Sequence, residues 1–181
     1  MASKDPKKFA PLLVGLHWLM LLLLVAVYAA MELRGIFPKG SDSREVIKTW
    51  HYMLGLSVFV LVWIRLIVHL VHATPVIQPI PPKWQIFLAR CTHVALYTLM
   101  IVMPLIGWVL LSAEGNSIPF FGLQLPPLVS ESKSLANQAK EVHEFIGTAG
   151  YFLIGLHALA ALFHHYIMRD DTLRRMLPFK R

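Results

Sequence analysis

The sequence predicts an all-α membrane protein: one domain, residues 1–181, folded as a bundle of four transmembrane helices. The chain is 56% hydrophobic and only 15% charged, and its mean hydropathy is +0.59, which is typical of membrane proteins. Four apolar runs are each long enough to cross a hydrocarbon core of about 30 Å as a helix. The net charge of +7 comes from basic residues at the ends of these runs, which indicates lipid rather than nucleic acid as the partner.

The four spans follow one another along the chain, at about residues 10–33, 46–71, 84–113 and 139–168. Pro11 stands where the first turn of a helix tolerates proline. The first span resembles a signal peptide, but its apolar run is long for one and three more spans follow. It is therefore interpreted as an uncleaved anchor.

The segments between the spans differ in character. Residues 34–45 form a polar turn rich in Gly, Pro and Ser. Residues 74–83 contain four prolines, which predicts a stiff connector without helix. Residues 114–138 are the longest loop, and its apolar middle, IPFFGLQLPPL, is too short and too rich in proline to span. We expect that stretch to lie at the membrane interface.

The distribution of Lys and Arg predicts the orientation. Of the 17 basic residues, eleven fall on the side that holds both termini: Lys4, Lys7, Lys8, Arg65, Lys83, Arg90, Arg169, Arg174, Arg175, Lys180 and Arg181. The opposite side holds Arg34, Lys39, Arg44, Lys48, Lys133 and Lys140. Cytoplasmic segments carry the excess of positive charge, so both termini are expected in the cytoplasm.

Cysteine and histidine usage narrows the chemistry. The single cysteine, Cys91, excludes an internal disulfide, the C-x-x-C-H attachment of a covalent haem and any four-cysteine iron–sulfur or zinc site. Nine histidines therefore carry most of the metal-binding capacity of the chain.

The last span carries two of these histidines on one face. His143 and His157 are fourteen residues apart, nearly four turns, which places their imidazoles roughly 20 Å apart along one stripe. Gly147 and Gly150 lie on the same stripe and would leave room for something flat and bulky. The simpler alternative is that each imidazole hydrogen-bonds a neighbouring helix.

Comparing depths across antiparallel spans sorts four histidines into two layers. On the outer side His51 and His143 both lie roughly 6–8 Å inside their spans. On the inner side His17 and His157 lie roughly 10 and 16 Å from theirs, which agree within the uncertainty of span ends. Two imidazoles from different helices at each level predict paired metal ligation.

Haem suits such a pair because its porphyrin is large, flat and apolar, and its iron accepts axial imidazole. Two non-covalent haem b groups are therefore expected. An iron with both axial positions filled by imidazole has no open position for a substrate and passes single electrons.

Several other residues of the spans have more than one interpretation or no assigned function. His93 lies roughly 14 Å deep, which depth alone does not separate from His17 as inner ligand; it could instead bond a haem propionate or line a quinone pocket. His164 ends the last span and is either an interfacial residue or part of a quinone site. Pro104 and Gly107 indicate a kink without an assigned function.

The basic residues of the outer side also have two interpretations. Arg34, Lys39, Arg44 and Lys48 are either a solvated turn or a positive mouth that pairs haem propionates or attracts a small anion.

The histidine-bearing segments resemble the bacterial cytochrome b561 family of small di-haem membrane proteins. The matching pieces are GLHWLMLLL, MELRGIFPKG, WHYMLGLSV and VHEFIGTAGYFLIGLHALAALFHHY, and the likeness runs essentially from end to end. The resemblance implies a four-helix bundle in the bacterial inner membrane. It also implies that His17 and His157 hold the inner haem and His51 and His143 the outer one, with His93 not a ligand.

Members of this family move electrons between a membrane quinone and a periplasmic partner, and some are described as superoxide oxidases. The resemblance therefore implies a superoxide:ubiquinone oxidoreductase. Arg34, Lys39, Arg44 and Lys133 would then attract superoxide or serve another periplasmic donor, and ubiquinone would bind near the inner haem, in the vicinity of His93 or His164.

Two other functions are compatible with the same pattern. One is a non-catalytic haem b subunit that relays electrons for a partner dehydrogenase or hydrogenase. The other is a metal transporter that uses the histidines to bind zinc. The absence of Asp and Glu from the middle of every span counts against a cation pathway.

Overall fold

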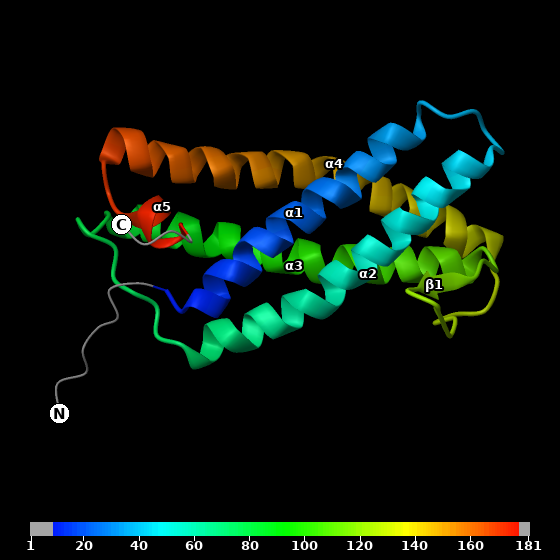
Figure 1. The fold of residues 1–181 in the computed structure, drawn as a ribbon, viewed down its shortest axis with the longest axis horizontal. Coiled ribbons are helices and arrows are strands. Elements are labelled where there is room, and N and C mark those ends of the chain that lie inside the picture. The colour runs from blue at the N-terminus through cyan, green and yellow to red at the C-terminus, as the bar shows by residue number, and fades with distance from the viewer. Residues whose placement is uncertain (1–8, 178–181) are drawn as a thin grey trace.

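Four long helices run the length of the molecule in alternating directions (Figure 1). In this computed structural model, which describes residues 9–177, they are α1 (Pro11–Arg34), α2 (Asp42–Val71), α3 (Lys83–Ala113) and α4 (Lys133–Phe163). A π-helical turn, η1 (His164–Met168), continues α4, and a short helix, α5 (Thr172–Arg175), follows. The four long helices, with η1 added to α4, are long and apolar enough to cross a membrane, which confirms the predicted fold.

Two helices begin earlier than their predicted spans. Helix α2 begins at Asp42 rather than near 46, and α4 begins at Lys133 rather than near 139. The added turns are polar, and at the start of α4 the hydroxyl of Ser132 accepts a hydrogen bond from Leu135 N at 3.4 Å, as an N-cap does. Hydropathy locates the part of a helix that crosses lipid, whereas the helix itself continues into water.

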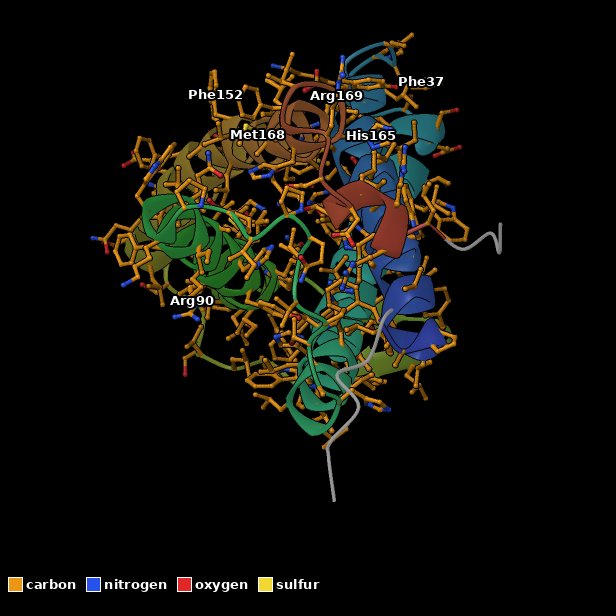
Figure 2. All side chains as sticks on the ribbon, turned by 90° about the vertical axis from the view of Figure 1, so that its left-hand side faces the viewer. Phe37, Arg90, Phe152, His165, Met168 and Arg169 are labelled. Atoms are coloured by element: carbon orange, nitrogen blue, oxygen red, sulfur yellow. The ribbon has the colours of Figure 1, made fainter. Side chains whose placement is uncertain are left out.

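The helices form two layers whose backbones approach each other where α2 meets α3. Helix α1 packs along α2, α3 packs along α4, and α2 also contacts α3. No Cα atom of α4 lies within 8 Å of a Cα atom of α1 or α2 in the part of the chain that the structure describes. Viewed from the end where α1 begins, α1 and α2 lie on one side and α3 and α4 on the other (Figure 2).

A small apolar core holds the layers together at mid-depth. It consists of Met20 from α1, Val58 and Val62 from α2, and Met100 from α3, and Val62 is fully buried. Many other large apolar side chains are exposed, such as Phe152 with 76% of its surface accessible. Lipid solvates such side chains in a spanning helix, so their exposure agrees with the membrane assignment.

The long loop contains a β-hairpin that hydropathy did not predict. Strands β1 (Ile118–Phe120) and β2 (Leu123–Leu125) pair antiparallel and join through Phe121 and Gly122, whose φ angles are 46° and 88°. Positive φ at both central residues is the type I′ geometry that matches strand twist. The side chain of Ile118 is buried against α2 and α3, so the hairpin covers their outer ends.

The opposite end of the bundle gathers the start of α1, the proline connector and α5 (Figure 1). The connector is free of helix, as predicted. It is tied to the C-terminal segment, because Gln78 N donates to the Asp171 carboxylate at 2.9 Å and Asp171 N donates to Gln78 O at 3.2 Å. Five basic residues that entered the orientation argument lie outside the described residues: Lys4, Lys7, Lys8, Lys180 and Arg181.

Candidate cofactor site

The outer pair of imidazoles bridges the two helix layers. His51 on α2 and His143 on α4 have ring centres 6.2 Å apart, with the ring planes at 76°. Nδ1 of His51 lies 3.1 Å from Val27 O, a distance at which Nδ1–H donates to the carbonyl. That tautomer leaves Nε2 unprotonated, which is the form of histidine that binds a metal.

Gly107 explains how the second outer imidazole fits. A Cβ atom at this position would lie 3.3 Å from Cε1 of His143, which is closer than ordinary van der Waals contact. The missing side chain therefore gives the imidazole room against α3. The sequence left Gly107 without a function, and the structure places it behind a candidate ligand.

The inner level brings three imidazoles together. His17 on α1 and His157 on α4 have ring centres 6.2 Å apart, with planes at 69°. His93 on α3 lies 5.6 Å from His157, so ring distance alone does not decide between His17 and His93. The helices do differ, because the backbones of α3 and α4 pack together, whereas no Cα atom of α1 lies within 8 Å of one of α4 among the described residues. Only the pair that includes His17 spans the space between the layers.

These separations fit one metal ion held between two imidazoles. Two metal–nitrogen bonds of about 2 Å in line, with about 1 Å from each nitrogen to its ring centre, place ring centres about 6 Å apart. Within residues 9–177, no group of three or more His, Cys, Asp or Glu side chains is placed to hold a bare metal ion. Two-imidazole sites suit a metal that brings its own equatorial ligands, as haem does.

Not every glycine of α4 leaves room for a flat group between the imidazoles. A Cβ atom at Gly150 would overlap the hydroxyl of Tyr28 and lie 3.3 Å from a methyl of Leu99. Tyr28 Oη also donates to Gly147 O at 3.0 Å. The expectation that Gly150 clears room for a flat group is therefore wrong for this residue, whose notch admits side chains of α1 and α3.

The outer basic residues divide into different roles. Arg44 donates from Nη1 to Arg34 O at 2.9 Å and to Phe37 O at 3.0 Å, which stabilises the end of α1 by satisfying free carbonyls. Lys39 is exposed. Lys133 lines a shallow recess of about 430 Å³ that also includes Glu114 and Glu131. The four residues predicted to attract an anion therefore do not form one uniform cluster.

The segment that follows the last span contains an acidic residue that sequence reasoning did not use. Asp170 is a buried residue, 5% exposed. Its carboxylate lies 2.5 Å from His164 Nδ1 and accepts from Thr172 N at 3.0 Å. Burial alone would raise the pKa of Asp170, and the hydrogen bonds from His164 and Thr172 lower it below its ordinary value. The signal in the sequence was two adjacent aspartates in an otherwise basic tail.

Arg65 is a second residue whose place the sequence did not reveal. It lies on α2, and its Nη1 donates to Leu13 O at 3.1 Å, one turn of α1 before His17. Sequence reasoning counted it only for orientation. A basic residue inside an apolar run was the available signal.

Comparison with known proteins places these features in a wider group. Residues 8–179 match the model of the family described as prokaryotic cytochrome b561. Cytochrome b561 homolog 1 of Escherichia coli (strain K12) is 43% identical over 171 residues, which cover 94% of this chain and 97% of that protein. The probable superoxide oxidase CybB of Yersinia pestis is 39% identical over 175 residues, which cover 97% and 98%.

Proposed function

The chain belongs to the prokaryotic cytochrome b561 family, and on that premise we propose that it carries electrons through two b-type haems from a periplasmic donor to ubiquinone in the inner membrane. Membership makes it a multi-pass bacterial membrane protein of electron transfer with b-type haem. The observation that supports two haems is the pair of 6.2 Å imidazole separations at two levels of the bundle.

In this proposal His51 and His143 hold the outer haem, and His17 and His157 hold the inner one. When bound, haem supplies one-electron transfer, because its iron changes valence without making or breaking ligand bonds. His51 is fixed in its tautomer by Val27 O, which orients its ring and raises its basicity as a ligand. His93 stays beside the inner site as a neighbour rather than a ligand, since α3 contacts α4 directly.

We propose superoxide as the donor. A relative that covers almost the whole chain carries the name probable superoxide oxidase, and the outer end of this chain carries Arg34, Lys39, Arg44 and Lys133. Two superoxide anions would each lose one electron to become O2, and ubiquinone would take up two electrons and two protons. Positive charge at the entrance raises the encounter rate with an anion and loses effect as salt screens it.

We place ubiquinone at the inner end, near His164 or His93. The ring of His164 is held by Asp170 through Nδ1. When the imidazole carries both protons, Nε2–H would donate to a quinone carbonyl. This end is the cytoplasmic one if the excess of basic residues sets the orientation, so the two protons would come from the cytoplasm.

The activity is tested with purified, haem-loaded protein in detergent or vesicles. With a steady supply of superoxide, ubiquinone should be reduced, and the rate should fall as ionic strength rises from low to physiological salt. Superoxide dismutase added in excess should abolish the reduction, which serves as the control. Absence of quinone reduction would contradict the superoxide activity, and a rate independent of salt would contradict only the attraction by the basic residues.

A further inference from the structure

We propose that Arg34, the last residue of α1, binds a propionate carboxylate of the outer haem and raises the midpoint potential of that haem. The inference rests on the proposed ligation of this haem by His51 and His143. A b-type haem carries two propionates, and an anion near a protein interior needs a charged or hydrogen-bonding partner.

The guanidinium of Arg34 could bind such a propionate, because it pairs with no carboxylate among the described residues. Its Nε exposes less than 1 Å² and makes no hydrogen bond, and none of the ion pairs within residues 9–177 involves Arg34. A buried donor without a partner costs about 1–3 kcal/mol, and more when it is charged. A bound carboxylate would remove that cost.

The carboxylates on the neighbouring turns do not neutralise Arg34. Glu32 accepts a hydrogen bond from the hydroxyl of Tyr151 at 2.7 Å, and Glu45 pairs with Lys48 at 2.7 Å. Asp42, the first residue of α2, forms no ion pair in the described part of the chain. The positive charge of Arg34 is therefore left for a ligand.

The surroundings of Arg34 place it beside the outer imidazole pair. Arg34 lies seven residues, about two turns, beyond Val27 on the same face of α1. Val27 O accepts the hydrogen bond from Nδ1 of His51, so Arg34 stands roughly 10 Å along the helix axis from a proposed ligand. The two hydrogen bonds from Arg44 fix the carbonyls of Arg34 and Phe37, which holds the end of α1 in place. From a backbone held in this way, the planar guanidinium of Arg34 can bind a carboxylate through two parallel hydrogen bonds.

The test is the midpoint potential of the outer haem in Arg34→Gln and Arg34→Lys, with the inner haem as internal reference. The spectrum of His51→Ala identifies which haem is the outer one. Loss of the cation leaves the propionate uncompensated, which favours ferric over ferrous iron. In Arg34→Gln we expect about a tenfold shift toward the ferric form, or about 59 mV downward for one electron, and a smaller shift in Arg34→Lys.

Lys39→Gln is the matched control, because it removes the same charge from an exposed position in the same turn. It should leave the potential unchanged. Two bound haems with an unchanged outer potential in Arg34→Gln would overturn the inference and leave the proposed function intact. An equal shift in Lys39→Gln, or a shift seen only in vesicles of anionic lipid, would also overturn it. A wild-type protein with fewer than two haems would contradict both.

Discussion

The outer and inner imidazole pairs share one separation but not one environment. Both pairs place ring centres 6.2 Å apart across the gap between the helix layers. The outer pair stands alone, with His51 held by a carbonyl of α1 and His143 packed against Gly107. The inner pair has a third imidazole, His93, within 5.6 Å of His157. Ring geometry therefore offers a single candidate pair of ligands at the outer level, whereas at the inner level the candidate pair depends on which helices leave room.

The largest expected effect is the loss of one haem when a proposed ligand is removed at either level. His51→Ala should bind one haem instead of two, because no other imidazole of the described residues lies at the outer level, and His157→Ala should lose the inner haem. Haem content per polypeptide, measured with the reduced spectrum, checks both. Each variant should keep the haem of the other level, and loss of both haems from either variant would mean that the levels are not independent.

At the inner level, the same measurement distinguishes His17 from His93 as the proposed ligand. His93→Ala should retain two haems, whereas His17→Ala should lose the inner one or bind it more weakly. The reason is that α3 packs against α4, whereas the Cα atoms of α1 stay more than 8 Å from those of α4 among the described residues. The reverse pattern would exchange the roles of the two histidines.

A smaller effect is expected from filling the space behind an outer ligand. In Gly107→Ala the new Cβ atom would lie 3.3 Å from the His143 ring, and such overpacking costs about 1–3 kcal/mol. The outer haem should therefore dissociate about ten times faster into an excess of a haem-binding acceptor, while the inner haem is unaffected. Gly55→Ala is the matched control, since its Cβ atom would meet nothing within 4 Å.

The smallest effect concerns Asp170, a buried carboxylate at the inner end of the molecule. Among the described residues, the outer end has no buried carboxylate. Because the pKa of Asp170 is lowered in the folded protein, the stabilisation it provides is fully present above the ordinary carboxyl range and is lost as pH falls through the lowered pKa. Asp170→Asn should remove it at neutral pH, so that backbone amides of α5 exchange several times faster.

Amide exchange followed by mass spectrometry, corrected for the intrinsic rate, measures this change. Haem content should not change, since Asp170 lies beyond the last span. Exchange in α5 that is identical in wild type and variant would show that its other contacts, such as the 2.6 Å hydrogen bond from Trp18 Nε1 to Met176 O, hold the segment by themselves.

The features that follow from regular helical geometry could be predicted from the sequence. The four spans follow from apolar length, and the two histidine levels follow from counting residues inward from span ends at 1.5 Å each. The structure brings His51 to His143 and His17 to His157, as the counting predicts. It does not test which of them bind iron, and that assignment stays a prediction.

Features that depend on single contacts between distant segments could not be predicted in this way. The hairpin requires Phe121 at a φ of 46°, which no local preference of phenylalanine signals. Arg34 and Arg44 look equivalent in sequence. The guanidinium of Arg44 caps the end of α1, whereas Nε of Arg34 is buried without a hydrogen-bond partner among the described residues. Asp170 and Asp171 are read as solvated charges until the fold brings them to His164 and Gln78.

Helix α4 meets the α1–α2 layer through side chains, such as Tyr28 with Gly147 O and Glu32 with Tyr151, rather than through packed backbones. This arrangement has a consequence for the stability of the protein in a cell. Two halves joined by one packed seam and a few such contacts are held together less firmly without haem, and a ligand that binds only the folded form stabilises the protein by mass action. Its cellular abundance should therefore rise and fall with porphyrin supply, because empty copies would open and be removed by membrane proteases.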